Sequence, residues 1–284
     1  MLLRCCSHTL DLTTPVVMGI LNVTPDSFSD GGRFSAHNRA VEHALAMIEA
    51  GAAIIDVGGE STRPGADAVT EEEEIRRVVP VIEALIQRVP AAIVSVDTSK
   101  AEVMRAALRA GASLINDVRG LREEGALQAA ADSNAAVCLM HMQGEPRTMQ
   151  AQPHYEDVVA EVVTFLEARI AACVAMGISR DRIVVDPGIG FGKRLEHNLR
   201  LLAHLPRLAE LGVPLLIGVS RKSLFGALLG RAVDERVAGG VAVATAALLA
   251  GTHVLRVHDV AETVDAVKVV AALQRAGYGK GEKS

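Results

Sequence analysis

Eight short apolar runs in this 284-residue sequence each end in polar side chains that could bind or transform a ligand. A single polar residue at such a position is usually a helix cap or a solvated loop residue. The same placement after eight runs is harder to explain in that way and indicates one shared site. These residues are Asn22, Asp56 with Glu60, Asp97, Asn116 with Asp117, His141, Asp186, Ser220 with Arg221 and Lys222, and Arg256 with His258.

One chemical subset is cationic, in a chain whose formal net charge is −5. Lysine acts as a point charge and arginine offers two parallel N–H donors, so both suit the oxygens of a phosphate or a diphosphate. The cationic subset therefore predicts an anionic ligand group. It consists of Arg63, Arg221, Lys222, Arg256 and His258.

A second subset, Asp97, Asn116 and Asp186, ends three apolar runs. Side chains at such positions are partly desolvated and need donor-rich partners. A heterocycle with an amino group beside a ring N–H offers a carboxylate two parallel donors, and an amide can both donate and accept. A guanine-like or pterin-like edge fits this set, and salt bridges from the acids to Arg221 or Lys222 are the alternative.

The glycine-rich stretch 186–193 reads DPGIGFGK and fits neither common nucleotide-binding motif. Pro187 stands where a P-loop needs glycine, and Lys193 stands where the Rossmann fingerprint needs its third glycine. The glycines are expected to let the backbone pass close to a flat ligand, with Phe191 as a stacking face. Ordinary turn formation is the alternative.

Two further stretches, 24–32 and 58–66, are rich in Gly, Pro and Ser, and each follows an apolar run. Such composition suits hinged lids that exclude water during a reaction. Ordinary surface loops explain the same composition.

The elements that must position these residues alternate regularly along the chain. Nearly continuous apolar runs, typical of strands buried on both faces, span 16–22, 53–58, 93–97, 113–116, 136–141, 183–186, 215–220 and 254–258. Stretches with helical spacing span 38–50, 71–88, 100–110, 122–132, 156–176, 195–211, 234–250 and 260–276. Eight units of about 35 residues predict an α/β fold of the (β/α)8 TIM-barrel type. An open doubly wound sheet is the structural alternative.

Composition narrows the remaining possibilities. No linker divides residues 1–284, so we expect one domain with its core at about 16–275, an N-terminal extension at 1–15 and a tail at 277–284. The acidic balance, with five Phe, two Tyr and no Trp, argues against nucleic-acid binding. The four cysteines lack C-x-x-C spacing and no apolar run approaches ~18 residues, which favours a reduced, cytoplasmic protein without membrane spans.

Eight motifs, in this order, resemble those of the dihydropteroate synthase family, and the resemblance covers about residues 16 to 270. Motifs of this length are highly specific, and no departure is found at a functional position of the family. They are MGILNVTPDSFSDGG at 18–32, DVGGESTRPG at 56–65, SVDT at 95–98, IND at 115–117, LMHM at 139–142, DPGIGFGK at 186–193, SRKS at 220–223 and RVHD at 256–259.

The resemblance implies a TIM barrel, a homodimer and a transferase of folate biosynthesis that is a sulfonamide target. Its reaction condenses 6-hydroxymethyl-7,8-dihydropterin diphosphate with 4-aminobenzoate to give 7,8-dihydropteroate and diphosphate. Mg2+ is the implied metal, contacted by Asn22 and the diphosphate.

Residue roles also follow from the resemblance, by motif. The residues implied to bind the pterin or its diphosphate are Thr62, Asp97, Asn116, Met140, Asp186, Phe191, Gly218, Lys222, Arg256 and His258. Those implied to border 4-aminobenzoate are Phe28, Thr62, Arg63, Pro64 and Ser223, the last of which lies near the start of a helix and so suits the carboxylate. Arg63 is also implied to contact the diphosphate.

Charge development suggests how these groups act. Loss of diphosphate leaves positive charge on the pterin, which Asp97 and Asp186 can stabilise, so we expect a dissociative reaction. Asp30, in the first glycine-rich loop, adds a further negative charge. Asn22, Arg256, His258 and Mg2+ stabilise the leaving group. The expected catalytic residues are Asp97, Lys222, Asp30 and Arg63.

Three other functions stay open on the sequence alone. A pterin-binding methyltransferase that uses methyltetrahydrofolate would share the Asp/Asn/Asp set, but it would have no reason to keep Arg63, Arg256 and His258. A non-catalytic pterin-binding barrel would bind without turnover. Lys222 could also form a Schiff base if it were desolvated.

Overall fold

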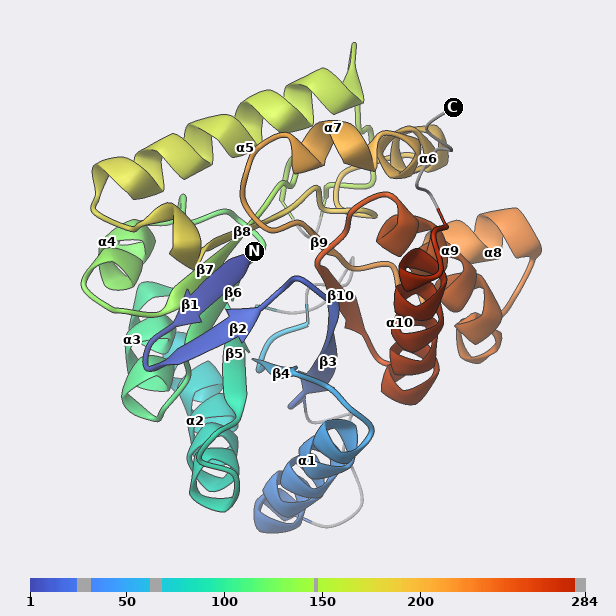
Figure 1. Cartoon of the computed structure of the whole chain (residues 1–284). Helices are drawn as coiled ribbons and strands as arrows, with labels where there is room; N and C mark the ends of the chain where they lie inside the picture. The colour runs from blue at the N-terminus through green and yellow to red at the C-terminus, as the bar shows by residue number, and fades with distance from the viewer. Residues whose placement is uncertain (25–31, 62–67, 146–147, 279–284) are drawn as a thin grey trace.

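The computed structural model describes residues 1–24, 32–61, 68–145 and 148–278. Eight parallel strands form a barrel in the order β8-β7-β6-β5-β4-β3-β10-β9, and a parallel bridge between Val185 and Leu215 joins the two ends of this order (Figure 1). The strands are β3 (Val16–Asn22), β4 (Ile54–Gly58), β5 (Ile93–Asp97), β6 (Leu114–Asp117), β7 (Ala136–Met140), β8 (Ile183–Asp186), β9 (Leu216–Ile217) and β10 (Val254–Val257). The predicted TIM barrel is confirmed, and the open sheet is excluded.

Helices surround the barrel as predicted, with three main differences and smaller shifts at other helix ends (Figure 1). The first helix begins at residue 32 and not at 38, the predicted helix 195–211 is two helices, and the helix start expected near Ser223 belongs to a short separate helix that precedes the predicted helix 234–250. The helices are α1 (Gly32–Glu49), α2 (Glu71–Arg88), α3 (Ala101–Arg109), α4 (Ala126–Ala131), α5 (Val158–Ala175), α6 (Leu195–Ala203), α7 (Leu205–Ala209), α8 (Ser223–Leu229), α9 (Val237–Leu249) and α10 (Val260–Arg275).

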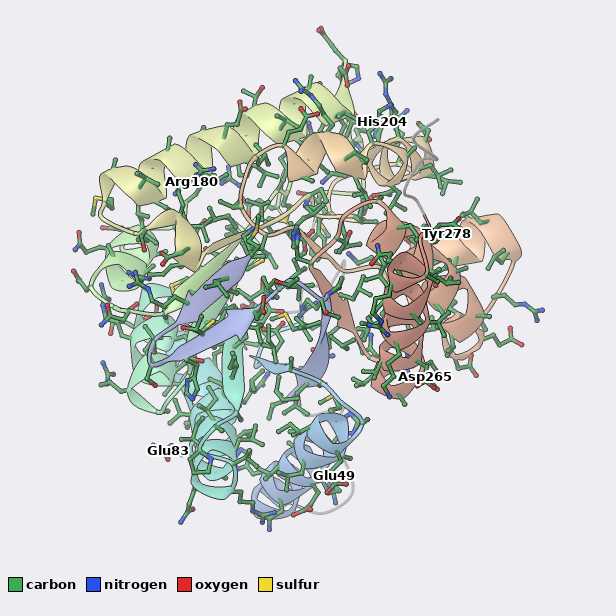
Figure 2. The ribbon with its side chains drawn as sticks, in the orientation of Figure 1. Glu49, Glu83, Arg180, His204, Asp265 and Tyr278 are labelled. Carbon is green, nitrogen blue, oxygen red and sulfur yellow. The ribbon has the colours of Figure 1, made fainter. Side chains whose placement is uncertain are left out.

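The apolar core lies mainly between the strands and this ring of helices, and it is built largely from Val, Leu, Ile and Ala side chains. Charged groups lie on the outer surface, where Figure 2 labels Glu49 on α1, Glu83 on α2 and Asp265 on α10, all exposed. Among the helices in the described part of the chain, none is long and apolar enough to cross a membrane.

A short antiparallel hairpin precedes the barrel, where the sequence predicted only an extension. Its strands are β1 (Leu2–Cys5) and β2 (His8–Asp11). Leu3, Cys5 and Leu12 are buried in an apolar cluster with residues at the N-terminal ends of the barrel strands, such as Ile54 on β4 and Leu114 on β6. The hairpin therefore closes the N-terminal end of the barrel (Figure 1), and the C-terminal end is left for a ligand site.

Candidate active site

The register of neighbouring strands brings three predicted site residues and Gly58 into one row at the C-terminal end of the barrel. Asn22 on β3 is level with Gly58 on β4, Gly58 with Asp97 on β5, and Asp97 with Asn116 on β6. A Cβ atom at Gly58 would lie 3.5 Å from the Asp97 Cβ and 3.8 Å from the Asn22 Oδ1. The glycine therefore keeps space open between a carboxylate and an amide oxygen.

Asp56 on β4 ties this row to Arg256 on β10, the strand that pairs with the other side of β3. Its Oδ2 accepts a hydrogen bond from the Asn116 Nδ2 at 3.0 Å and another from the Arg256 Nε at 2.6 Å. The Arg256 Nη2 also donates to the Asp97 Oδ2 at 2.6 Å. Asp56 is fully buried, and its Oδ1 has no hydrogen-bond partner among the described residues. One guanidinium thus orients two acids, and through Asp56 it also orients the amide.

The charges of this network are strongly influenced by burial. Burial raises the pKa of Asp97 to about 7, while the Arg256 guanidinium lowers it and the Asp56 carboxylate raises it further. Burial acts to lower the pKa of Arg256, but Asp56 and Asp97 outweigh that effect and raise it. Arg256 therefore stays charged, and Asp97 is the group whose charge changes near neutral pH.

Asp186 and Lys222 form the second half of the site. Asp186 ends β8, level with Met140 at the end of β7, and its Oδ1 accepts the backbone N–H of Gly188 at 2.7 Å. Burial raises the pKa of Asp186, while Lys222 lowers it. Burial lowers the pKa of Lys222 to about 8, while Asp186 raises it. The Lys222 Nζ donates to the carbonyl oxygen of Ile189.

Met140 and Phe191 lie on one apolar wall. Met140 packs in a buried cluster with Val118, Met142 and Met149, and Phe191 packs against that cluster. The Lys222 Nζ lies 4.8 Å from the centre of the Phe191 ring, within the range of a cation–π interaction. A flat, donor-rich ring would meet apolar surface here next to the acids.

The other predicted binding residues lie around β9 and β10. Gly218 is buried beside Arg256, and a Cβ atom there would lie 3.7 Å from the Arg256 Cβ, at ordinary van der Waals distance. The backbone N–H of His258 donates to the Ser220 Oγ at 3.1 Å, and the His258 Nδ1 lies 3.1 Å from the same oxygen. Ser223 is exposed at the start of α8.

The alternative of internal salt bridges holds only in part. Asp97 is paired with an arginine, but the partner is Arg256 and neither Arg221 nor Lys222. Arg221 pairs instead with Asp259 on the outer side of the same loops, with its side chain 41% exposed. Arg221 is thus separated from the cationic subset that the sequence suggested.

Five predicted residues lie outside the described part of the chain. They are Phe28, Asp30, Thr62, Arg63 and Pro64. Both stretches that were expected to act as lids, 24–32 and 58–66, include such residues. The lid function therefore stays a prediction from composition, and the roles of the five residues stay predictions from the resemblance.

Asn22 is the residue predicted to contact Mg2+. Among the described residues, no group of three or more His, Cys, Asp or Glu side chains could hold a metal ion. Mg2+ commonly takes one or two protein oxygens together with waters and substrate phosphates. The single amide oxygen of Asn22, beside Gly58, fits a cation that binds together with the diphosphate. It does not fit a metal ion held by protein ligands alone.

Two residues of the site were missed as functional candidates. Asp56 was noted only as a polar residue at a strand end, although it holds both Asn116 and Arg256. Lys193 was read only as a break in a glycine motif, yet it is 3% exposed and bonded to the loop around it. A charged residue inside an apolar or glycine-rich run was the available signal, because such a charge needs a specific partner.

Comparison with known proteins gives a consistent result. Residues 18–258 match the family model described as pterin binding enzyme. The dihydropteroate synthase of Escherichia coli (strain K12) is 55% identical over 272 residues, which are 96% of each chain.

Two solved structures are similar over nearly the whole length. A Yersinia pestis dihydropteroate synthase, solved with a sulfonamide drug complex, has a TM-score of 0.92 and 53% identity and covers 97% of this chain and 100% of its own. A Xanthomonas albilineans dihydropteroate synthase, solved with 4-aminobenzoic acid, has a TM-score of 0.90 and 55% identity and covers 96% of this chain and 99% of its own.

Proposed function

Because this chain belongs to the pterin-binding enzyme family and, within it, to the dihydropteroate synthases, we propose that it condenses 6-hydroxymethyl-7,8-dihydropterin diphosphate with 4-aminobenzoate. The products are 7,8-dihydropteroate and diphosphate. The observation that carries this proposal is the meeting of Asp97, Asn116 and Asp186 with Lys222 and an apolar wall at one end of the barrel. Acceptors, an amide and a ring-sized apolar face are the groups that recognise a pterin.

The pterin is held by its polar edge in this proposal. Carboxylates of Asp97 and Asp186 accept its amino and ring N–H groups, and Asn116 donates and accepts. Met140 and Phe191 cover the ring. The fixed geometry of Asp97 and Asn116 supports these roles, because hydrogen bonds from Arg256 to Asp97 and from Asn116 to Asp56 hold both side chains within the protein.

The reaction begins with breakage of the bond between the methylene carbon and the diphosphate oxygen. The electron pair leaves with the diphosphate, and the positive charge that remains is spread over the reduced pterin ring near Asp97 and Asp186. The amine nitrogen of 4-aminobenzoate then forms the new C–N bond with its lone pair and loses a proton to solvent. An arylamine is neutral at pH 7, so no base has to act before the attack.

Cationic and polar groups stabilise the departing diphosphate in this proposal. Arg256 and His258 face its oxygens, Gly218 lies beside the arginine, and Lys222 adds a charge from the pterin side. A divalent cation is consistent with the family, and we propose Mg2+, held by Asn22 and the diphosphate, where it would neutralise charge on the leaving oxygens. Arg63 and Asp30 are proposed to complete the set from the two loops.

The aminobenzoate site is proposed at the rim of the barrel. Ser223 at the start of α8 offers its hydroxyl and backbone N–H to the carboxylate. Phe28, Thr62, Arg63 and Pro64 are proposed to enclose the ring.

Competing functions find less support. A methyltransferase that binds methyltetrahydrofolate has no use for Arg256 and His258 at the mouth of the barrel. A Schiff-base enzyme would need Lys222 facing a carbonyl substrate, but its Nζ already donates to Ile189 and faces Phe191.

A product assay tests the proposed function. The protein is mixed with the pterin diphosphate and radiolabelled 4-aminobenzoate, with Mg2+ or with a chelator, and dihydropteroate and diphosphate are measured. Formation of both products only with Mg2+ is expected. Tight binding of the pterin without product would favour a binding module or a methyltransferase relative.

We also propose a homodimer of one-domain subunits in the cytoplasm. Exposed apolar side chains on neighbouring α8, α9 and α10, such as Leu228, Leu249 and Val269, support the dimer (Figure 1). The four cysteines are free, which suits a reducing compartment. Light scattering of the purified protein tests the dimer, since a monomer at assay concentration would contradict it.

A further inference from the structure

Lys193 ends the glycine-rich loop after β8 and is 3% exposed, which is rare for a lysine. Its Nζ lies 2.9 Å from the Gly188 carbonyl oxygen, 3.0 Å from the Phe191 carbonyl oxygen and 2.9 Å from the His141 Nδ1. The His141 carbonyl oxygen lies at 3.4 Å. Burial lowers the pKa of Lys193 well below its ordinary value, while the Asp186 carboxylate raises it. Three acceptors around one nitrogen match the three N–H donors of an ammonium, so the contacts favour the charged form, and the three shorter ones use all of its donors.

His141 is suited to the acceptor role in this cluster. Burial, followed by the charge of Lys193, lowers its pKa to about 2, so its ring is neutral at physiological pH. The ring packs edge-on against Phe165, with 4.9 Å between the ring centres. A neutral ring whose Nδ1 faces the ammonium accepts a hydrogen bond there, with its proton on Nε2.

The loop between Gly188 and Gly192 lies very close to the segment that follows β7. A Cβ atom on Gly188 would lie 1.9 Å from the His141 carbonyl oxygen, and one on Gly192 would lie 2.2 Å from the Gln143 carbonyl oxygen. Both glycines have positive φ, at 68° and 61°. Backbone meets backbone at this contact, and Lys193 spans it, with acceptors on both sides.

This loop carries groups that face the proposed pterin site. The Ile189 carbonyl oxygen accepts a hydrogen bond from the Lys222 Nζ, and a Cβ on Gly190 would lie 3.1 Å from the Lys222 Cδ. The Phe191 ring lies 4.8 Å from the same Nζ. A shift of the loop would therefore move Phe191 and the hydrogen-bond acceptor of Lys222 together.

We propose that Lys193 is a positioning residue for pterin recognition. Its ammonium fastens the loop 188–192 to the segment after β7 and thereby sets Phe191 and Lys222 against the pterin, although Lys193 itself does not touch it. The inference deepens the proposed function and rests on it, because the ligand that benefits is the pterin diphosphate.

The test compares Lys193→Met, which keeps the length and removes the donors, with wild type and with Lys268→Met. Lys268 is a matched control on α10, with its side chain 72% exposed. Calorimetry gives the dissociation constant of the pterin diphosphate, and steady-state kinetics at saturating pterin gives the KM for 4-aminobenzoate. We expect Lys193→Met to weaken pterin binding at least tenfold and to change that KM by less than threefold, with Lys268→Met unchanged.

A purely structural lysine would behave differently, since its loss would lower the melting temperature but leave the folded fraction binding pterin as wild type does. Unchanged affinity in folded Lys193→Met would overturn the inference. Failure of the wild type to bind pterin would instead overturn the proposed function.

A second pair of variants decides the matter if Lys193→Met does not fold. His141→Leu removes the acceptor for the lysine, and His141→Gln restores an amide oxygen. We expect weaker pterin binding in His141→Leu and an affinity within threefold of wild type in His141→Gln. Equal affinities in the two variants would overturn the inference.

Discussion

Two partly buried side chains, Asp97 and Lys222, have pKa values close to neutral pH. Burial raises the pKa of Asp97 to about 7 and lowers that of Lys222 to about 8. A carboxylate is needed to accept pterin N–H groups, and an ammonium is needed for the charge beside Phe191. The site therefore has both charges together only in a narrow interval.

We predict that the affinity for the pterin diphosphate is highest between about pH 7 and 8. It should fall by up to about tenfold per pH unit below 7 as Asp97 gains a proton, and fall again above 8 as Lys222 loses one. Calorimetry across pH measures this. Asp97→Asn should remove the acidic limb, and an unchanged acidic limb in that variant would show that another group is titrating.

The same shift affects the stability of the free protein. The pKa of Asp97 is above its ordinary value of 3.8, so the unfolded chain releases this proton first as the pH rises. Its contribution to folding is present below about pH 4 and is lost as the pH approaches 7. The pH range of strongest predicted pterin binding, about 7 to 8, is thus one in which the ionised Asp97 lowers the free energy of unfolding.

Asp56 is predicted to organise the site without touching the reacting atoms. Asp56→Asn removes the fully buried one of the two carboxylates that pair with the partly buried Arg256, and breaking a buried ion pair costs roughly 3–5 kcal/mol. We expect a loss of about 3 kcal/mol in unfolding free energy in denaturant titrations and at least tenfold weaker pterin binding. Glu42→Gln removes an exposed partner of Arg88 and serves as control. Equal stability of the two variants would refute this role.

At the scale of elements, the loop after β8 depends on glycines that could be predicted only in part. Gly188 combines a positive φ with a clash distance of 1.9 Å, whereas Gly177 has a φ of 86° and nothing within 4 Å of an added Cβ. An alanine at Gly177 therefore tests the cost of the positive φ alone. An alanine at Gly188 tests that cost together with the displacement of the loop by the added methyl group.

We predict that Gly177→Ala costs about 1–2 kcal/mol of stability and leaves pterin affinity unchanged, because only the left-handed conformation is penalised. Gly188→Ala should also weaken pterin binding at least tenfold, since its methyl group displaces the loop from His141. Thermal denaturation and calorimetry measure the two effects. Wild-type affinity in Gly188→Ala would contradict the close packing of this loop.

The barrel strands and most helices followed from apolar runs and periodicity, and the misses have physical reasons. The hairpin β1–β2 has short strands, and Cys6 occupies the positive-φ position of its turn, at 54°. Glycine or asparagine usually stands at such a position, so the residues that normally mark a hairpin turn are absent from the sequence here. The predicted helix 195–211 is divided at His204, and Pro206 in the first turn of α7 was the missed signal. The predicted strand 215–220 is shorter in the structure, where Leu216–Ile217 form β9 and Leu215 pairs by its bridge to Val185; the residue after β9, Gly218, lies against Arg256.

At the scale of the whole molecule, strand ends could be predicted to converge because a parallel barrel places all of them at one mouth. The partners inside that mouth could not be predicted. The ion pair between Arg256 and Asp56 joins residues 200 positions apart, and periodicity carries no information about such a contact. Burial, which shifts the pKa of Asp97 and Lys222, likewise depends on the closed barrel.

The hairpin at the opposite end explains why only one mouth is available. Leu3, Cys5 and Leu12 fill the N-terminal end of the barrel with apolar side chains. Polar groups, cations and glycine-rich segments therefore gather at the C-terminal end, where the reaction is proposed.

The most direct test of the account is the formation of 7,8-dihydropteroate by wild type, Asp97→Asn and Lys222→Met under one set of conditions, with pterin diphosphate, labelled 4-aminobenzoate and Mg2+. The account predicts product with the wild type and at least a hundredfold lower kcat/KM in both folded variants. Wild-type rates in either variant, or no product from the wild type, would contradict the claim that this reaction takes place at these residues.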